Sequence, residues 1–183
     1  MPAGFWTAGE VRLADTLLTF DGSGSPLVIA LARLVNVFVR DPFLTLVALS
    51  VIASVAAAVF IGLSCGRIFG SPWTGAAVAV TALLSPALLM FGPLPDVESV
   101  AIASAAATLF CFVTRRPELF AISAAAAIGA RPDMAPAMLA MFVIGIAVLP
   151  RKGRSIAAFA AATLILFVPL HELVVFETYP QFR

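Results

Sequence analysis

The sequence predicts an all-α fold: a polytopic bundle of transmembrane helices, with about five to seven membrane segments, in one domain over residues 1–183. Of the 183 residues, 62% are hydrophobic and 11% are charged, whereas about a quarter of the residues in a soluble domain are charged. Several apolar stretches approach the ~20 residues that a helix needs to cross a bilayer. This composition excludes a soluble globule and indicates the lipid bilayer as a partner.

The first segment, residues 1–25, mixes acidic residues and an arginine with leucine and valine. This mixture predicts an amphipathic helix on the outer face of a membrane. No basic stretch followed by an apolar one opens the chain, so no signal peptide is expected. Turn residues at 21–26 end the segment. The apolar stretch Leu27–Val39 that follows is too short to cross a bilayer alone, and we expect a re-entrant or tilted helix there.

Membrane helices are expected over residues 26–176, with a tail at 177–183. The clearest span is Phe43–Leu63, which carries no charge and has the length that a bilayer requires. Proline, glycine or arginine residues mark the ends of the further apolar stretches. The additional expected spans are Trp73–Phe91, Val97–Val113 and Ile156–Phe176.

A charged break, Gly129–Asp133, separates the half-length apolar segments Leu119–Ile128 and Ala135–Leu149. Two short apolar segments around such a break are typical of a helix pair whose turn lies within the protein rather than in lipid. The sequence therefore predicts a broken hairpin with a buried charged turn.

The positions of the charges predict an orientation, because cytoplasmic loops of membrane proteins hold most of the Lys and Arg. One face collects six basic residues and a single acid, Glu118; the basic residues are Arg67, Arg115, Arg116, Arg151, Lys152 and Arg154. Nine of the ten acids then lie on the outer face, where we expect any chemistry. The basic residues do not form the concentrated patch that a nucleic acid would require, so no nucleic-acid partner is expected.

Charged residues within or beside the apolar stretches are the candidate site residues, since a charge at the centre of a bilayer costs about 2.5–3.5 kcal/mol. We expect five of them to line one wet cavity on the outer face: Glu10, Asp96, Glu98, Arg131 and Asp133. The planar guanidinium of Arg131 suits an anionic lipid phosphate. Two structural alternatives stay open: solvation at interface depth, and capping of a helix start by Arg131 and Asp133.

Metal and disulfide chemistry is restricted by the residue counts. His171 is the single histidine, and Cys65 and Cys111 are the two cysteines. A multi-histidine metal site, a disulfide framework and a four-cysteine site are therefore excluded. His171 beside Glu172 is interpreted as a structural pair, with proton transfer or a metal contact as the alternative.

Several short motifs resemble a known family. The run Gly9–Leu18, followed by Gly24–Leu27 and a short apolar helix, resembles the first external loop of membrane glycosyltransferases with the GT-C fold. The motifs Leu84–Pro86 with Asp96, and Gly129–Pro132, resemble later parts of the same fold. The family includes protein mannosyltransferases and aminoarabinose transferases, which use polyprenyl-phosphate sugars. The resemblance covers residues 8–150 and is to a truncated or partial form of the fold.

This resemblance implies sugar transfer from a polyprenyl-phosphate donor at the outer face of a bacterial inner membrane. Glu10 matches an acidic position that acts in acid/base catalysis or holds a divalent metal ion, and Gly9 stands where the family has a second acid. Arg131 would bind the donor phosphate, and the other substrate-binding candidates are Asp96, Glu98 and Asp133. The alternative is a catalytically silent subunit that packs against other membrane proteins in a larger complex. A small transporter or lipid-binding protein is a third possibility.

Overall fold

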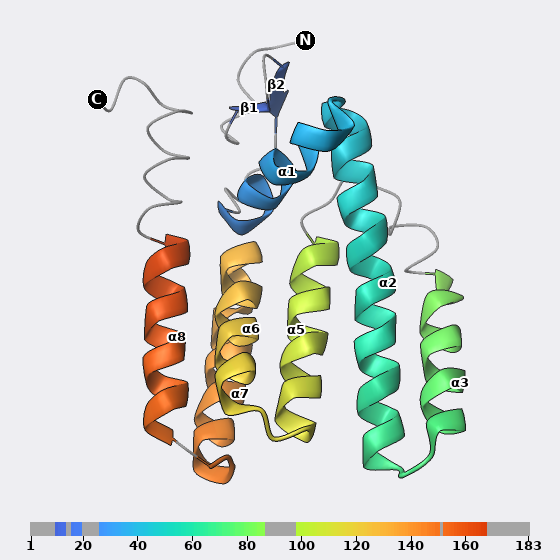
Figure 1. Ribbon diagram of the computed structural model, residues 1–183, viewed down its shortest axis with the longest axis vertical. Coiled ribbons are helices and arrows are strands. Elements are labelled where there is room, and N and C mark those ends of the chain that lie inside the picture. Colours follow the sequence, from blue (N-terminus) through green and yellow to red (C-terminus); the bar gives the residue numbers. More distant parts are fainter. Residues whose placement is uncertain (1–9, 14–15, 20–25, 87–97, 151, 168–183) are drawn as a thin grey trace.

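The computed structural model describes residues 10–13, 16–19, 26–86, 98–150 and 152–167. These residues are predominantly helical, as expected, and one short β-hairpin precedes the helices. The helices α2, α3, α5, α6, α7 and α8 stand side by side, while α1 lies obliquely across one end of the bundle (Figure 1).

The N-terminal segment differs from the expectation. An antiparallel hairpin of β1 (Glu10–Leu13) and β2 (Thr16–Thr19) forms there, with Glu10 opposite Thr19. The expected amphipathic helix over residues 1–25 is therefore wrong for these strands. The physical reason is local: polar and apolar residues alternate along β1, which is the period of a strand, and threonine favours β2 at both ends. Strand β1 contacts α1.

Helix α1 (Pro26–Val39) is inclined to the bundle, in agreement with the expected tilted helix (Figure 1). Helix α2 (Pro42–Ile68) begins at an N-cap, where the Asp41 carboxylate accepts a hydrogen bond from the Leu44 backbone N–H at 3.0 Å. Proline at the first helical position favours the same start. The predicted apolar helix from residue 43 is confirmed, and it continues five residues beyond Leu63.

Among the described residues, the segment Phe43–Ile68 of α2 is the one helix long and apolar enough to cross a membrane. Helix α3 (Pro72–Leu83) ends earlier than the expected span Trp73–Phe91. Pro86 accounts for the early end, because it lacks an N–H and disfavours helical backbone at the preceding residue. The remainder of that expected span, from residue 87, lies outside the described residues.

Helix α5 (Glu98–Val113) matches its predicted range within one residue. The predicted break is confirmed: α6 (Pro117–Ala130) and α7 (Ala135–Val148) are separate helices joined by a short 3₁₀ helix, η1 (Pro132–Met134). Helix α8 (Lys152–Phe167) is the last one described. The further part of the expected span to residue 176, including His171 and Glu172, lies outside the described residues.

The direction of the helices places charged residues at both ends of the bundle. Helix α5 begins, and α6 finishes, at the end of the bundle that α1 crosses (Figure 1). This end, named the acidic end after the carboxylates of Glu98 and Asp133, also carries Arg131 and, between α1 and α2, Arg40 and Asp41. The opposite end, the basic end, holds the α2–α3, α5–α6 and α7–α8 turns. Its described basic residues are Arg67, Arg115, Arg116, Lys152 and Arg154.

Each end of the bundle has its own packing. At the acidic end, Val28 of α1 packs with small residues of α2, α5 and α6. At the basic end, rings from four helices follow one another: the centroids of Phe112 and Phe120 are 5.8 Å apart, those of Phe120 and Phe142 5.9 Å, and those of Phe142 and Phe159 4.2 Å. Aromatic packing therefore connects α5, α6, α7 and α8 near the basic end.

Candidate functional site

The turn after α6 positions the central candidate, Arg131. Helix α6 runs to Ala130, and Arg131 is its C-cap with an extended backbone (φ −150°, ψ 102°). Pro132 explains this conformation, because the residue before a proline is pushed out of the helical region. The Arg131 N–H still donates to the carbonyl of Ala127 at 3.0 Å, which closes the last turn of α6.

Arg131 joins two carboxylates. Its Nε donates to Oδ1 and Oδ2 of Asp133, each at 2.9 Å, and its Nη1 donates to Oε1 of Glu98. Asp133 lies in the same turn, whereas Glu98 is the first residue of α5. The three side chains form the ion cluster at the acidic end. The structure thus brings together three of the five residues that the sequence singled out.

The ion cluster is partly open to solvent, which corrects the expected buried turn. The side chains of Arg131, Glu98 and Asp133 are 35%, 50% and 63% exposed. The broken hairpin was predicted from two short apolar segments, but the first of them, Leu119–Ile128, is part of a 14-residue helix that extends two residues further at each end. The turn therefore lies at the end of the bundle, with its carboxylates partly exposed, instead of inside it.

Electrostatics keeps Arg131 charged. Its hydrogen bond to Glu98, and then that to Asp133, raise the pKa of Arg131 above its ordinary value, because both carboxylates favour the charged guanidinium. Two carboxylates against one guanidinium make the cluster acidic overall. Nη2 makes no hydrogen bond with a described residue.

A buried group of apolar residues holds the backbone that carries the ion cluster. Ala130, which precedes Arg131, and Val100, two residues after Glu98, belong to one buried group with Val28 of α1 and Ala53 of α2. Met134 of η1 packs against the same group. Both partners of the long-range ion pair therefore extend from backbone that is held by the core.

Buried hydroxyl groups near this end were not singled out in the sequence. Ser54 of α2 donates from Oγ to Oγ of Ser99 at 3.4 Å, next to Glu98. Thr45 Oγ1 donates to Oδ1 of Asn36 at 3.1 Å, which connects α2 to α1. The sequence contains a pattern that could have indicated these hydroxyl groups. Thr45, Ser50 and Ser54 recur every four or five residues along an otherwise apolar helix, so they share one face.

The other two candidates are not assembled with the ion cluster by any described contact. Glu10 begins β1, whose side chains lie outside the description, and β1 contacts α1. Asp96 lies outside the described residues. The structure therefore places Glu10 by its backbone alone, beside the helix that crosses the acidic end.

The resemblance implies a divalent metal ion, and the described residues to test for such a site are those of the ion cluster. Across the described ranges, no three acidic, histidine or cysteine side chains gather closely enough to hold a metal ion. Glu98 and Asp133 face the guanidinium of Arg131, whose positive charge opposes a second cation. The described residues do not form a cation site.

Comparisons with protein-family models, with curated proteins and with solved structures found no match for this chain.

Proposed function

We propose that this chain is an integral membrane protein, similar to a GT-C glycosyltransferase, that binds a polyprenyl-phosphate sugar at its acidic end and transfers the sugar at the outer face of a bacterial inner membrane. The observation that carries the proposal is the convergence of Arg131 and Glu98, from separate helices, at the end that α1 crosses.

Membrane insertion is supported by the apolar exterior of the helices. Ile52 and Val55 of α2, Val143 of α7, and Leu164 and Ile165 of α8 are all more than 40% exposed. Residues of this kind on several helices form the surface that lipid tails would cover. The larger number of basic residues at the basic end supports an orientation with that end in the cytoplasm.

About five to seven membrane segments remain part of this proposal. Helices α5, α6 and α7 contain 16, 14 and 14 residues, which at 1.5 Å per residue is about 21–24 Å. A hydrocarbon core is about 30 Å thick. These helices would cross it with local thinning of the bilayer and with long side chains reaching the interface, adjustments that cost fractions of a kcal/mol per Å.

In the proposed reaction, an acceptor hydroxyl attacks the anomeric carbon of the donor sugar, and the polyprenyl phosphate leaves. The role of Arg131 would be to hold that phosphate through Nη2, while Glu98 and Asp133 fix the orientation of the guanidinium. Glu10 would take the proton of the acceptor hydroxyl as a general base. Asp96 would contribute to substrate binding.

The ion pairs themselves favour a second candidate, the catalytically silent subunit of a membrane complex. Arg131 is already neutralised by Glu98 and Asp133, and an anion would meet an acidic cluster. In this alternative the cluster fixes the α6–α7 turn against α5, and the exposed apolar faces pack against other membrane proteins instead of lipid.

Membrane topology is the first test. In a chain whose Cys65 and Cys111 are replaced by alanine, single cysteines at Asp133 and Lys152, both exposed, should react with an impermeant thiol reagent from opposite sides. Both should react after permeabilisation. Labelling of the two positions from the same side of intact membranes contradicts the orientation, and recovery of the chain in the soluble fraction contradicts membrane insertion.

Phosphate binding separates the two candidates. Polyprenyl phosphate is titrated into the purified chain in detergent micelles. If Arg131 binds the phosphate, Arg131→Gln should lose binding, and Asp133→Asn should strengthen it by removing a competing charge. Arg154→Gln, at the basic end, is the matched control and should bind like the wild type. If the wild type does not bind polyprenyl phosphate, or if Arg131→Gln binds it as well as the wild type does, phosphate binding by Arg131 is contradicted. The silent subunit then remains as the candidate function.

A further inference from the structure

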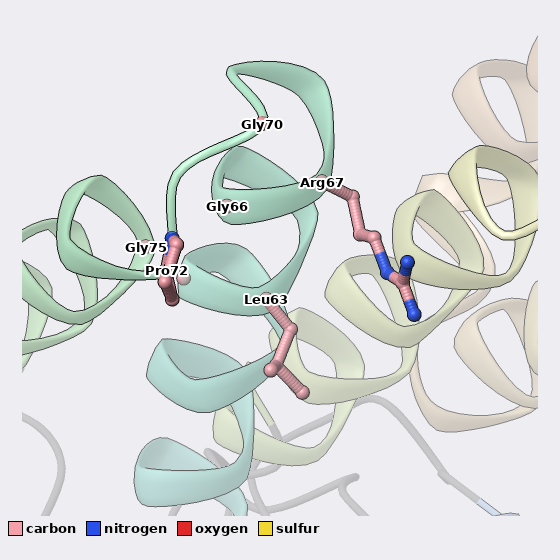
Figure 2. Close-up of a pocket in the computed structure, with 7 residues that line it drawn as sticks. Leu63, Gly66, Arg67, Gly70, Pro72 and Gly75 are labelled. Atoms are coloured by element: carbon pink, nitrogen blue, oxygen red, sulfur yellow. The ribbon is translucent and has the colours of Figure 1, made fainter.

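A groove of about 400 Å³ lies at the basic end, beside the turn that joins α2 to α3 (Figure 2). Its floor is the glycine face of α2. Figure 2 shows Pro72 and Gly75 of α3 on one side of Gly66, and Leu63 and Arg67, projecting from α2, on the other. The further lining residues are Gly62 and Gly70.

Glycines beside this groove hold α2 close to α3. A Cβ on Gly62 would lie 2.6 Å from both the Ala79 Cβ and the Gly75 carbonyl oxygen, and a Cβ on Gly75 would lie 2.6 Å from the Gly62 oxygen. The backbones therefore touch without side chains between them. Gly70 has a positive φ of 66°, a conformation that glycine adopts at little cost and that closes the short turn.

The lining changes from apolar to cationic towards the end of α2. Leu63 is 48% exposed, and Arg67, one helical turn further, is exposed in the last turn of the helix. Arg67 forms no ion pair with a described residue. The groove thus offers an unmatched positive charge beside an apolar wall, an arrangement complementary to an anionic group attached to an acyl chain.

The position of the groove at the end of an apolar helix also favours an anionic group attached to an acyl chain. The apolar segment of α2 ends at Ile68, and three large side chains around the turn are exposed: Ile68 at 58%, Phe69 at 69% and Trp73 at 84%. Tryptophan with arginine next to the end of an apolar helix is typical of the interface between a bilayer and water. Lipid phosphates lie at that depth, and the cytoplasmic leaflet is rich in anionic lipid.

We propose that this groove binds the phosphate headgroup of an anionic phospholipid, with Arg67 on the phosphate and an acyl chain along Leu63. The occupant is a bilayer lipid of the leaflet at the basic end, distinct from the polyprenyl-phosphate donor at the acidic end. This proposal rests on the membrane insertion proposed above and does not depend on catalysis.

The experiment measures thermal unfolding of the full chain in a neutral detergent while phosphatidylglycerol or phosphatidylcholine is added. The wild type should be stabilised at lower concentrations of phosphatidylglycerol than of phosphatidylcholine. Arg67→Gln should weaken the apparent phosphatidylglycerol affinity by about five- to tenfold, the loss expected for one arginine near a charged lipid surface. Arg67→Lys should keep most of that affinity, because the positive charge is retained.

Arg154→Gln makes the same chemical change at the same end of the bundle, away from the groove, and should retain the wild-type affinity. Equal affinity of Arg67→Gln and wild type overturns the proposal, as does an equal loss in Arg154→Gln, which indicates a diffuse charge effect. Stabilisation by inorganic phosphate at the same concentration also overturns it, in favour of a free anion. Recovery of the chain outside membranes contradicts membrane insertion instead, so the two failures are distinguishable.

Discussion

Arg131 and Glu98 are 33 positions apart in the chain, yet Nη1 of the arginine donates a hydrogen bond to Oε1 of the glutamate. This bond joins the turn after α6 to the first residue of α5, two helices that pack extensively against each other. The second partner of the arginine, Asp133, is local. The long-range bond therefore fixes how two helices meet, while the local one orients the guanidinium.

The coupling between Arg131 and Glu98 can be measured with a double-mutant cycle. Because both side chains are partly exposed, Arg131→Gln, Glu98→Gln and the double variant should give a coupling free energy of about 0.5–1 kcal/mol. Unfolding in mixed detergent micelles provides the measurement. In 1 M salt the coupling should shrink. A coupling of zero at low salt contradicts the ion pair.

The contribution of Arg131 should not vary with pH near neutrality. Since Glu98 and Asp133 raise the pKa of Arg131, its stabilisation is complete below the pKa of arginine in the unfolded chain, which lies far above neutrality, and is lost as the pH rises through the folded value. The difference in unfolding free energy between wild type and Arg131→Gln should therefore be constant from about pH 6 to pH 9. A difference that changes across this interval contradicts the assignment.

The close packing of α2 on α3 predicts how a substitution at Gly62 changes the stability of the chain. Gly62→Ala should destabilise the chain by about 1–3 kcal/mol, because the new Cβ must push the two backbones apart. Gly153 of α8 is the matched control, since a Cβ there meets nothing within 4 Å. Gly153→Ala should be neutral, or stabilise by up to about 1 kcal/mol through helix propensity. Equal effects of the two substitutions in unfolding experiments contradict the glycine contact.

Gly145 makes a second close contact, with an aromatic ring. A Cβ on this residue would clash with two ring carbons of Phe120, which is fully buried. Gly145→Ala should cost about 1–3 kcal/mol of unfolding free energy through overpacking. Adding Phe120→Leu should cost less in this background than in the wild type, because the smaller side chain relieves the clash. Additive losses in the double variant contradict the proposed contact.

The helix pattern was largely predictable from the sequence, and the reasons are local. Pro132 within an apolar stretch predicts the break after α6, since proline ends a helix at the preceding residue. An uncharged run after Asp41 and Pro42 predicts α2. The hairpin of Glu10–Leu13 with Thr16–Thr19 was missed because the four-residue alternation in its first strand competes with a weak amphipathic pattern over a longer window.

The candidate site was only partly predictable. Charge asymmetry placed Glu98 and Arg131 on one face, and the structure joins them. Their exposure depends on how far each helix extends, which a charged break does not reveal, so the buried turn was wrong. The hydroxyl pair of Ser54 and Ser99 depends on the rotation of α2 against α5, and a single sequence carries that information weakly.

The two ends of the bundle are stabilised by different kinds of interaction. An ion pair and small residues hold the end near Arg131 together, whereas a row of packed aromatic rings from Phe112 to Phe159 connects the helices near the other end. Salt screens the ion pair, whereas a kosmotropic salt such as sulfate strengthens burial of the aromatic rings. The bundle therefore has a preferred direction of opening: as ionic strength rises, the helices should separate first beneath α1, and the aromatic end should act as the hinge.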